Sequence, residues 1–269
     1  MKKNRFLLVA MLFATLSLGF VSCDDNKGNE PDDPRGEQTE QNGSTESNGG
    51  EETPEPADSY NGHAYVDLGL SVKWATCNIG ATKPEEYGNY YAWGEVEPKE
   101  VYDWSTYKFM DSNINDWNGV NKYTVADSQN EYGDVVWYDN SGNFIGDNKT
   151  ILEKEDDAAT VNMGGSWRMP TAEEQQELID ECTWTWTTLN DVNGYNVEGP
   201  NGNSIFLPAA GYRYDSDLRF AGSLGCYWSG SLNAVRSNGA YGLYFESGVV
   251  DCGSIADRCF GLAVRGVSK

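Results

Sequence analysis

The chain changes character near residue 60, and this change limits where a folded core can form. Residues 24–59 are dominated by Asn, Gly, Glu, Asp, Pro, Ser and Thr, with almost no apolar side chains. Between Cys23 and Ser59 there are 12 acidic and 2 basic residues. Such a segment cannot bury enough apolar surface to offset the entropy lost on ordering. We therefore expect residues 23–59 to form a disordered, self-repelling acidic tether.

The first 22 residues have the pattern of an export signal peptide. Three basic residues, Lys2, Lys3 and Arg5, precede an apolar run over residues 6–21. This run is too short for a comfortable transmembrane helix and has the length of a signal-peptide core.

The end of this signal resembles the lipobox of bacterial lipoproteins, because the small residue Ser22 precedes Cys23. The resemblance implies that Cys23 becomes the diacylated first residue of the mature protein. Asp24-Asp25 also resembles the acidic surface-export signal of Bacteroidetes lipoproteins. We expect an outer-membrane, lipid-anchored, surface-exposed protein. The alternative is ordinary secretion, with Cys23 left in the tether.

Residues 60–269 are rich in aromatic side chains and are long enough for one core. The whole chain has 9 Trp and 16 Tyr, a formal net charge of -23, and a single histidine, His63. The negative charge disfavours nucleic acid and anionic lipid as partners, so the lipid anchor is the one expected membrane contact. One histidine excludes a histidine-based catalytic triad and a multi-histidine zinc site.

Two helices are expected in this domain. The first covers residues 156–163, with Asp157 as a possible N-cap and two glycines at its end. The second follows Pro170, with Thr171 and Glu174 forming a capping box. Its buried face should contain Leu178 and Ile179.

The rest of the domain reads as short strands and loops. Strands are expected at 183–187, 195–198, 204–207, 227–229, 242–246 and 261–265, with two more in 65–75 and one at 90–93. Turn signals occur at 193–194 and 200–203. Residues 99–150 look like a loop-rich insertion, with one hairpin over 134–145 that turns at 140–143.

Several sequence blocks together resemble a known family. They lie at residues 66–70, 73–78, 91–95, 165–171, 206–211, 227–229 and 264–265. In this order they are similar to the Fibrobacter succinogenes major paralogous domain, which is common in Bacteroidetes lipoproteins. The entry to the second helix, Trp167 to Thr171, also resembles the formylglycine-generating-enzyme branch of the C-type-lectin fold. The resemblance implies an α+β, C-type-lectin-like domain with small twisted antiparallel sheets, two flanking helices and long loops.

Relatives in that family occur as targets of diversity-generating retroelements, and residues 227–265 resemble such a variable region. If Leu243 and Phe245 face the core, alternate residues of the same strand face solvent. The resemblance and the alternation give one expected binding face, formed by Gly242, Tyr244, Glu246, Val249, Asp251, Ile255, Asp257 and Phe260. The alternative is an ordinary outer strand face with a plain hairpin loop.

Catalysis is not expected, although the formylglycine branch is catalytic. A reactive cysteine pair could come only from Cys252 and Cys259, whose neighbours Asp251 and Asp257 should raise the thiol pKa. The simpler interpretations of Cys252 and Cys259 are a local disulfide or two unrelated cysteines. The carboxylates of Asp215-Ser216-Asp217 are a weak calcium signal, so we expect no metal and no cofactor.

These observations predict a non-catalytic, adhesin-like domain that binds a protein or glycan ligand on another cell or host surface. One alternative is glycan capture for a polysaccharide-utilisation system, which exposed aromatic rings in a shallow groove would favour. The other is a structural or assembly subunit of the envelope or a surface appendage. A long unpaired edge strand or a large flat apolar patch would favour assembly.

We predict that Cys23 is the first residue of the mature protein and carries lipid. The reason is the apolar segment that ends at Ser22-Cys23. Mass spectrometry of the purified membrane form tests this. An unmodified Cys23, or a mature chain that starts elsewhere, would contradict the prediction.

Overall fold

The computed structural model describes residues 58–111, 119–129, 137–139 and 141–269. The chain divides into two units, Met1–Pro54 and Glu55–Lys269. The expected signal peptide, the site of lipidation at Cys23 and nearly all of the tether lie outside the described residues. Ser59 already pairs with Ala64 in a strand, so the folded domain begins slightly before residue 60.

The helical elements are short. They are the 3₁₀ helices η1 (Trp104–Thr106) and η3 (Lys154–Asp156) and the α-helices α1 (Ala158–Met163) and α2 (Ala172–Glu181). No helix within the described ranges is both long enough and apolar enough to cross a membrane.

Most of the regular structure is β-strand. The strands are β1 (Ser59–Tyr60), β2 (His63–Val66), β3 (Lys73–Ala75), β4 (Thr183–Leu189), β5 (Val192–Glu198), β6 (Ser204–Pro208), β7 (Tyr212–Tyr214), β8 (Asp217–Arg219), β9 (Leu224–Leu232), β10 (Gly239–Glu246), β11 (Val249–Asp251), β12 (Ile255–Asp257) and β13 (Val267–Ser268).

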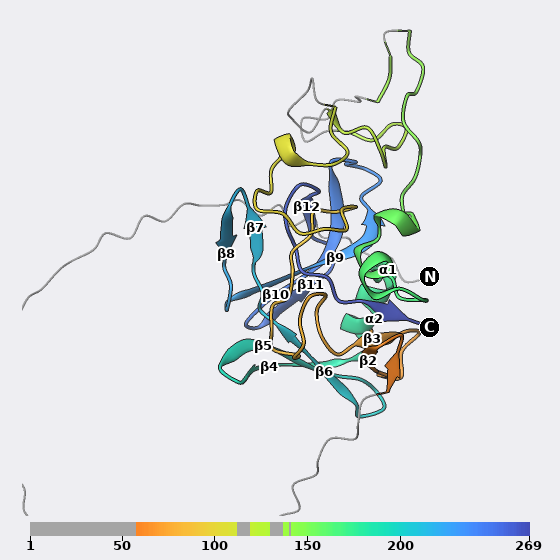
Figure 1. Cartoon of the computed structure of the whole chain (residues 1–269). Coiled ribbons are helices and arrows are strands. Elements are labelled where there is room, and N and C mark those ends of the chain that lie inside the picture. The colour runs from red at the N-terminus through yellow and green to blue at the C-terminus, as the bar shows by residue number, and fades with distance from the viewer. Residues whose placement is uncertain (1–57, 112–118, 130–136, 140) are drawn as a thin grey trace, which may run out of the picture. The chain divides into compact units, whose positions relative to one another are not determined.

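These strands form small antiparallel sheets (Figure 1). One sheet has the order β1-β2-β3-β13, and a second has the order β4-β5-β6. In the third, β10 pairs with β9 on one side and with β11 and β12 on the other, while β7 and β8 form a separate hairpin. Helix α2 packs against β9 and β10. The α+β class with small antiparallel sheets is therefore confirmed.

Both expected helices form where their caps predicted. The Asp157 side chain accepts a hydrogen bond from the Thr160 amide at the start of α1. Thr171 and Glu174 make the reciprocal bonds of a capping box at the start of α2. Because local side-chain bonds fix these ends, the sequence alone located them.

Two expected strands and one expected turn are wrong. Residues 90–93 and 261–265 are not strands, because they make only single bridges, such as that between Tyr91 and Leu262. Asn193 and Gly194 lie inside β5 instead of at a turn. The chain turns at Asn190 and Asp191, whose φ angles of 47° and 65° give a two-residue hairpin loop.

The hairpin expected in the insertion is confirmed over its described part. Tyr138 and Phe144 form a bridge, and the Asp139 amide donates to the carbonyl of Asn143 at 2.9 Å. The Asp139 carboxylate also accepts from the amide of Ser141 and from that of Asn143. Residues 134–136 and 140 of this hairpin lie outside the described residues.

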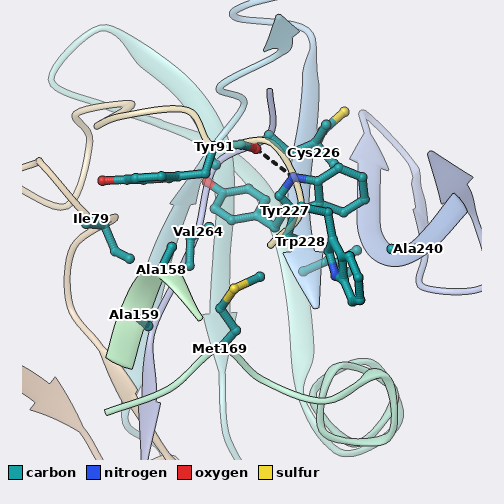
Figure 2. Close-up of a cluster of buried hydrophobic side chains, with 14 of the residues drawn as sticks. Ile79, Tyr91, Ala158, Ala159, Met169, Cys226, Tyr227, Trp228, Ala240 and Val264 are labelled. Carbon is teal, nitrogen blue, oxygen red and sulfur yellow. Dashed lines mark hydrogen bonds between the residues drawn. The ribbon is translucent and has the colours of Figure 1, made fainter. Parts of the chain in front are cut away.

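The core is built around tryptophan. Figure 2 shows Tyr227 and Trp228 of β9 together with Met169 and two alanines of α1, while the Trp228 indole donates to the carbonyl of Tyr91 at 2.7 Å. The Trp93 indole donates to the carbonyl of Ser229 at 2.8 Å. Both tryptophans are fully buried, so these bonds satisfy donors that water cannot reach.

The register of β10 agrees with the expected core face. Leu243 and Phe245 are each 1% exposed, whereas Glu246 is exposed. The Phe245 ring lies against the rings of Tyr195 and Tyr227, with centroids 5.4 and 5.8 Å away.

We predict that Phe245→Ala lowers the free energy of unfolding by about 3–5 kcal/mol, the usual loss for a buried phenylalanine. Glu246→Ala, on the adjacent exposed position, should change it by less than about 0.5 kcal/mol. Urea denaturation of both variants measures this. Similar losses for the two variants would mean that the strand register is wrong.

Candidate functional site

The structure removes Gly242 from the expected binding face. Gly242 is buried at an irregularity where the β9–β10 register shifts after Ala240. A Cβ atom at this position would lie 2.7 Å from the carbonyl oxygen of Tyr227. The position therefore needs glycine for close packing of two backbones, and the expectation that it faces solvent is wrong.

Tyr244 is also not the exposed anchor that strand alternation predicted. Its side chain is half-buried, and its hydroxyl is buried without a hydrogen-bond partner in the described part of the chain. Burial raises the pKa of Tyr244 well above its usual value, with further contributions from Cys226 and Tyr212. The outer face of β10 is therefore covered near Tyr244, which the pattern of one strand could not reveal.

The expected residues on β11 and β12 do reach solvent. Val249 is 52% exposed and Ile255 is 40% exposed, and Asp251 is exposed as well. Val249 pairs directly with the exposed Glu246 across the β10–β11 hairpin. Asp257 is half-buried and accepts a hydrogen bond from Asn238 at 3.4 Å. Along the chain, the expected residues in this part of the face are alternately apolar and acidic.

Phe260 belongs to a different group of residues, which we name the hairpin aromatic cluster: Tyr212, Tyr214, Phe220 and Phe260. The rings of Tyr212 and Phe260 are stacked at 18° with centroids 5.7 Å apart. The Phe220 ring lies 6.0 Å from the Tyr212 ring, and the Tyr214 ring meets the Phe260 ring edge-on at 5.0 Å. The β7–β8 hairpin, which contains Tyr212 and Tyr214 and is followed directly by Phe220, stands at the left of Figure 1.

The cluster is open to solvent at Phe220, whose side chain is 53% exposed. Phe220 also has a φ angle of 57°, in the left-handed region that bulky residues rarely adopt. Beside it, the Arg219 guanidinium lies 4.5 Å from the centre of the Tyr214 ring, and Leu218 is 40% exposed. Backbone strain and exposed apolar surface are each associated with functional sites.

Sequence reasoning missed three members of this cluster. The sequence did contain a signal for this hairpin. Aromatic and charged residues alternate in Tyr212-Arg213-Tyr214, the turn follows at Asp215-Ser216, and polar and apolar residues alternate again from Asp217 to Arg219. Strand alternation places Tyr212 and Tyr214 on one face, as observed, but only the folded chain brings Phe260 to them.

All five cysteines in the described part of the chain are free thiols, so the local disulfide between Cys252 and Cys259 does not form. Burial and the neighbouring Asp251 raise the pKa of Cys252 to about 11. Burial and Asp257 raise the pKa of Cys259 further above the usual range. The predicted direction is confirmed, although burial is the larger cause. Thiols of this kind are poor nucleophiles at neutral pH.

One carboxylate group resembles a metal site by proximity, formed by Glu153, Glu155 and Asp156. Lysine side chains already neutralise it. Asp156 accepts from Lys108 at 2.7 Å, from Lys122 at 2.5 Å and from the Tyr123 hydroxyl at 2.6 Å. Burial alone would raise the pKa of Asp156, but these three bonds outweigh it and lower the pKa. The group therefore acts as an ion-pair network that anchors the insertion to η3.

Comparison with known proteins gives no match: no protein-family model, curated protein or solved structure matches the chain.

We predict that Asp156→Asn lowers the free energy of unfolding at pH 7 by about 2–3 kcal/mol, because bonds to charged groups are lost. The lowered pKa of Asp156 means that its contribution is present above the unfolded-state value near 4 and disappears as the pH falls through the folded-state value. Urea denaturation from pH 7 to pH 2 should therefore show the two proteins converging at low pH. Glu155→Gln, at an exposed neighbour, is the control. A loss that is equal at every pH would contradict the assignment.

Proposed function

We propose that this chain is a surface-exposed outer-membrane lipoprotein that displays a non-catalytic, adhesin-like binding domain on an acidic tether. The lipobox-like end of the signal at Ser22-Cys23 supports the anchor. The 12 acidic and 2 basic residues between Cys23 and Ser59 support an extended tether. The ligand is a protein or a glycan on another cell or host surface.

We assign the domain to the C-type-lectin-like fold and to the Fibrobacter succinogenes major paralogous family. Small antiparallel sheets with two short helices and long connections support this assignment. The residues that carry the resemblance include Trp74, Trp93, Trp167, Trp228 and Arg265, all of which are 0–1% exposed. The shared blocks therefore correspond to the packed core, where a family is expected to keep its residues.

The observation that carries the binding proposal is the solvent-open hairpin aromatic cluster. Large aromatic rings provide much of the binding free energy at recognition surfaces, because they bury wide apolar areas at low entropic cost. Phe220 and Leu218 expose apolar surface beside the ion pair of Arg219 and Asp217, whose charged atoms are 3.7 Å apart. Phe260 joins this surface to the segment in which the variable-type positions Val249 and Ile255 are exposed.

The same observation favours glycan capture as a second candidate function. The exposed Phe220 ring follows the ion pair of Arg219 and Asp217 in the chain and offers an apolar platform with polar groups nearby. A sugar has the complementary character, with an apolar C–H face and hydroxyl groups around its edge.

We predict that Phe220→Ala combined with Phe260→Ala weakens ligand binding by about tenfold or more, as expected for aromatic anchors. The whole chain is used against a glycan array and in a surface-protein pull-down, and the melting temperature is measured for each variant. Val235→Ala is the matched control, because Val235 is 65% exposed and lies outside the cluster. Undiminished binding by the double variant would place the ligand site elsewhere in the domain.

A further inference from the structure

Strand β4 has a long edge without hydrogen-bond partners. It has seven residues and pairs with β5 on one side only in the described part of the chain. None of its backbone groups bonds to a loop, a helix or another strand among the described residues. In Figure 1, β4, β5 and β6 lie together at the bottom of the domain. A free edge of this length is a template for another strand.

The turn geometry shows which backbone groups face outward. Leu189 and Val192 flank the two-residue loop, so they form the hydrogen-bonded pair next to it. Hydrogen-bonded and non-bonded pairs alternate along an antiparallel ladder. The amide and carbonyl groups of Trp184, Trp186 and Thr188 therefore point away from β5, toward the free edge.

The edge lacks the features that usually prevent strand addition. The sequence of β4 contains no charged residue and no proline, and its pairing with β5 is continuous without a bulge. The edge strands β8, β11 and β12 have three residues each. Edge strand β6 has five residues, but four of them are buried and its Phe206 carbonyl accepts from Arg265. The long strand β9 is covered on its far side, where Trp228 donates to the carbonyl of Ala263 and Leu232 to that of Thr150. Only β4 combines length with an open edge in the described chain.

The surface around β4 is acidic. From residue 169 to residue 212 the sequence contains seven acidic residues and no lysine or arginine. Four of these acids lie at the two ends of β4 and are exposed: Asp180, Glu181, Asp191 and Glu198. Two copies of such an edge would repel each other, so the charge favours a basic partner over a second copy.

The side chains of β4 determine which residue types suit the partner strand. Thr183, Thr185 and Thr187 are exposed on one face of β4, while Trp184 and Trp186 are half-buried on the other. A neighbouring strand places alternate residues beside these two rows. Residues beside the indoles should be apolar, and residues beside the threonines should be small and polar.

We propose that the β4 edge is a strand-addition site for an extended polypeptide segment with alternating apolar and hydroxyl side chains and with lysine or arginine at both ends. The added strand extends the β4-β5-β6 sheet. This site is separate from the hairpin aromatic cluster, and the proposal does not depend on the function assigned to that cluster.

The test uses the whole chain and a labelled synthetic peptide of alternating valine and threonine with two lysines at each end. Fluorescence anisotropy measures binding, and amide hydrogen exchange measured by NMR locates it. The proposal requires slower exchange at the amides of Trp184, Trp186 and Thr188. Thr185 and Thr187, which already bond to β5, should change little. Replacing the lysines by glutamates, or N-methylating alternate peptide amides, should each weaken binding by about tenfold or more.

Variants of the chain separate backbone pairing from charge. Thr188→Pro removes one outward amide and should weaken peptide binding by about five- to tenfold, whereas Thr188→Ala keeps the amide and should bind normally. Glu181→Lys with Asp191→Lys should also weaken binding, and Glu155→Lys, an exposed acid outside this surface, should not. If Thr188→Pro fails to fold, the N-methylated peptide still gives the decisive comparison.

Three results would overturn the proposal. One is equal binding of the N-methylated and unmodified peptides, which excludes backbone pairing. Another is unchanged exchange at the three outward amides in the presence of bound peptide. The third is a dimer of the unliganded chain that Thr188→Pro abolishes, which would make a second copy the natural occupant of the edge.

Discussion

Two buried arginines, held by backbone carbonyls, connect the loops of this domain to its core. Arg265 is 1% exposed and donates to the carbonyls of Ala75, Thr76 and Phe206 and to the side chain of Asn78. Arg258 is 0% exposed and donates to three other carbonyls and to the Tyr107 hydroxyl. Burial lowers the pKa of Arg265, yet guanidinium stays charged, so its cost must be offset by full hydrogen bonding. A loop-rich chain needs such donors, because many of its carbonyls lie outside sheet ladders.

This arrangement decides which parts of the C-terminal segment can serve recognition. Arg258, Cys259 and residues 261–265 are buried, and their bridges hold Tyr91, Arg213 and Tyr227 in place. Side chains at these positions cannot vary without loss of the core. Exposed positions such as Val249 and Ile255 precede these buried residues in the chain and carry no such constraint. The proposal of a variable region in this segment is therefore compatible with its exposed positions alone.

The sequence predicts the structural features that depend on neighbouring residues. The predictions are wrong where contacts with residues far away in the chain determine the structure. The caps of both helices and the exposure of Glu246 follow from neighbours a few residues away. Residues 261–265 were predicted to be a strand because they are mostly apolar. A buried segment that makes single bridges to several other segments has the same apolar pattern. Asn-Gly at 193–194 is a favourable turn sequence. The chain turns at Asn190-Asp191 instead, and in the resulting strand register Tyr195 and Val197 are buried. The exposure of Tyr244 was predicted wrongly because the sequence of one strand does not show which other segments pack over its side chains.

The two surfaces of the domain differ in chemistry, and this difference limits what each can bind. The hairpin aromatic cluster lies beside Arg213 and Arg219, with cation–ring distances of 5.3 and 4.5 Å to Tyr90 and Tyr214. The β4 edge lies within a stretch that has seven acids and no base. Apolar contacts with aromatic rings persist at high salt, whereas charge complementarity at an exposed edge is screened. Because neither surface uses residues of the other, a ligand at the proposed cluster site leaves the proposed β4 site free for a basic extended segment.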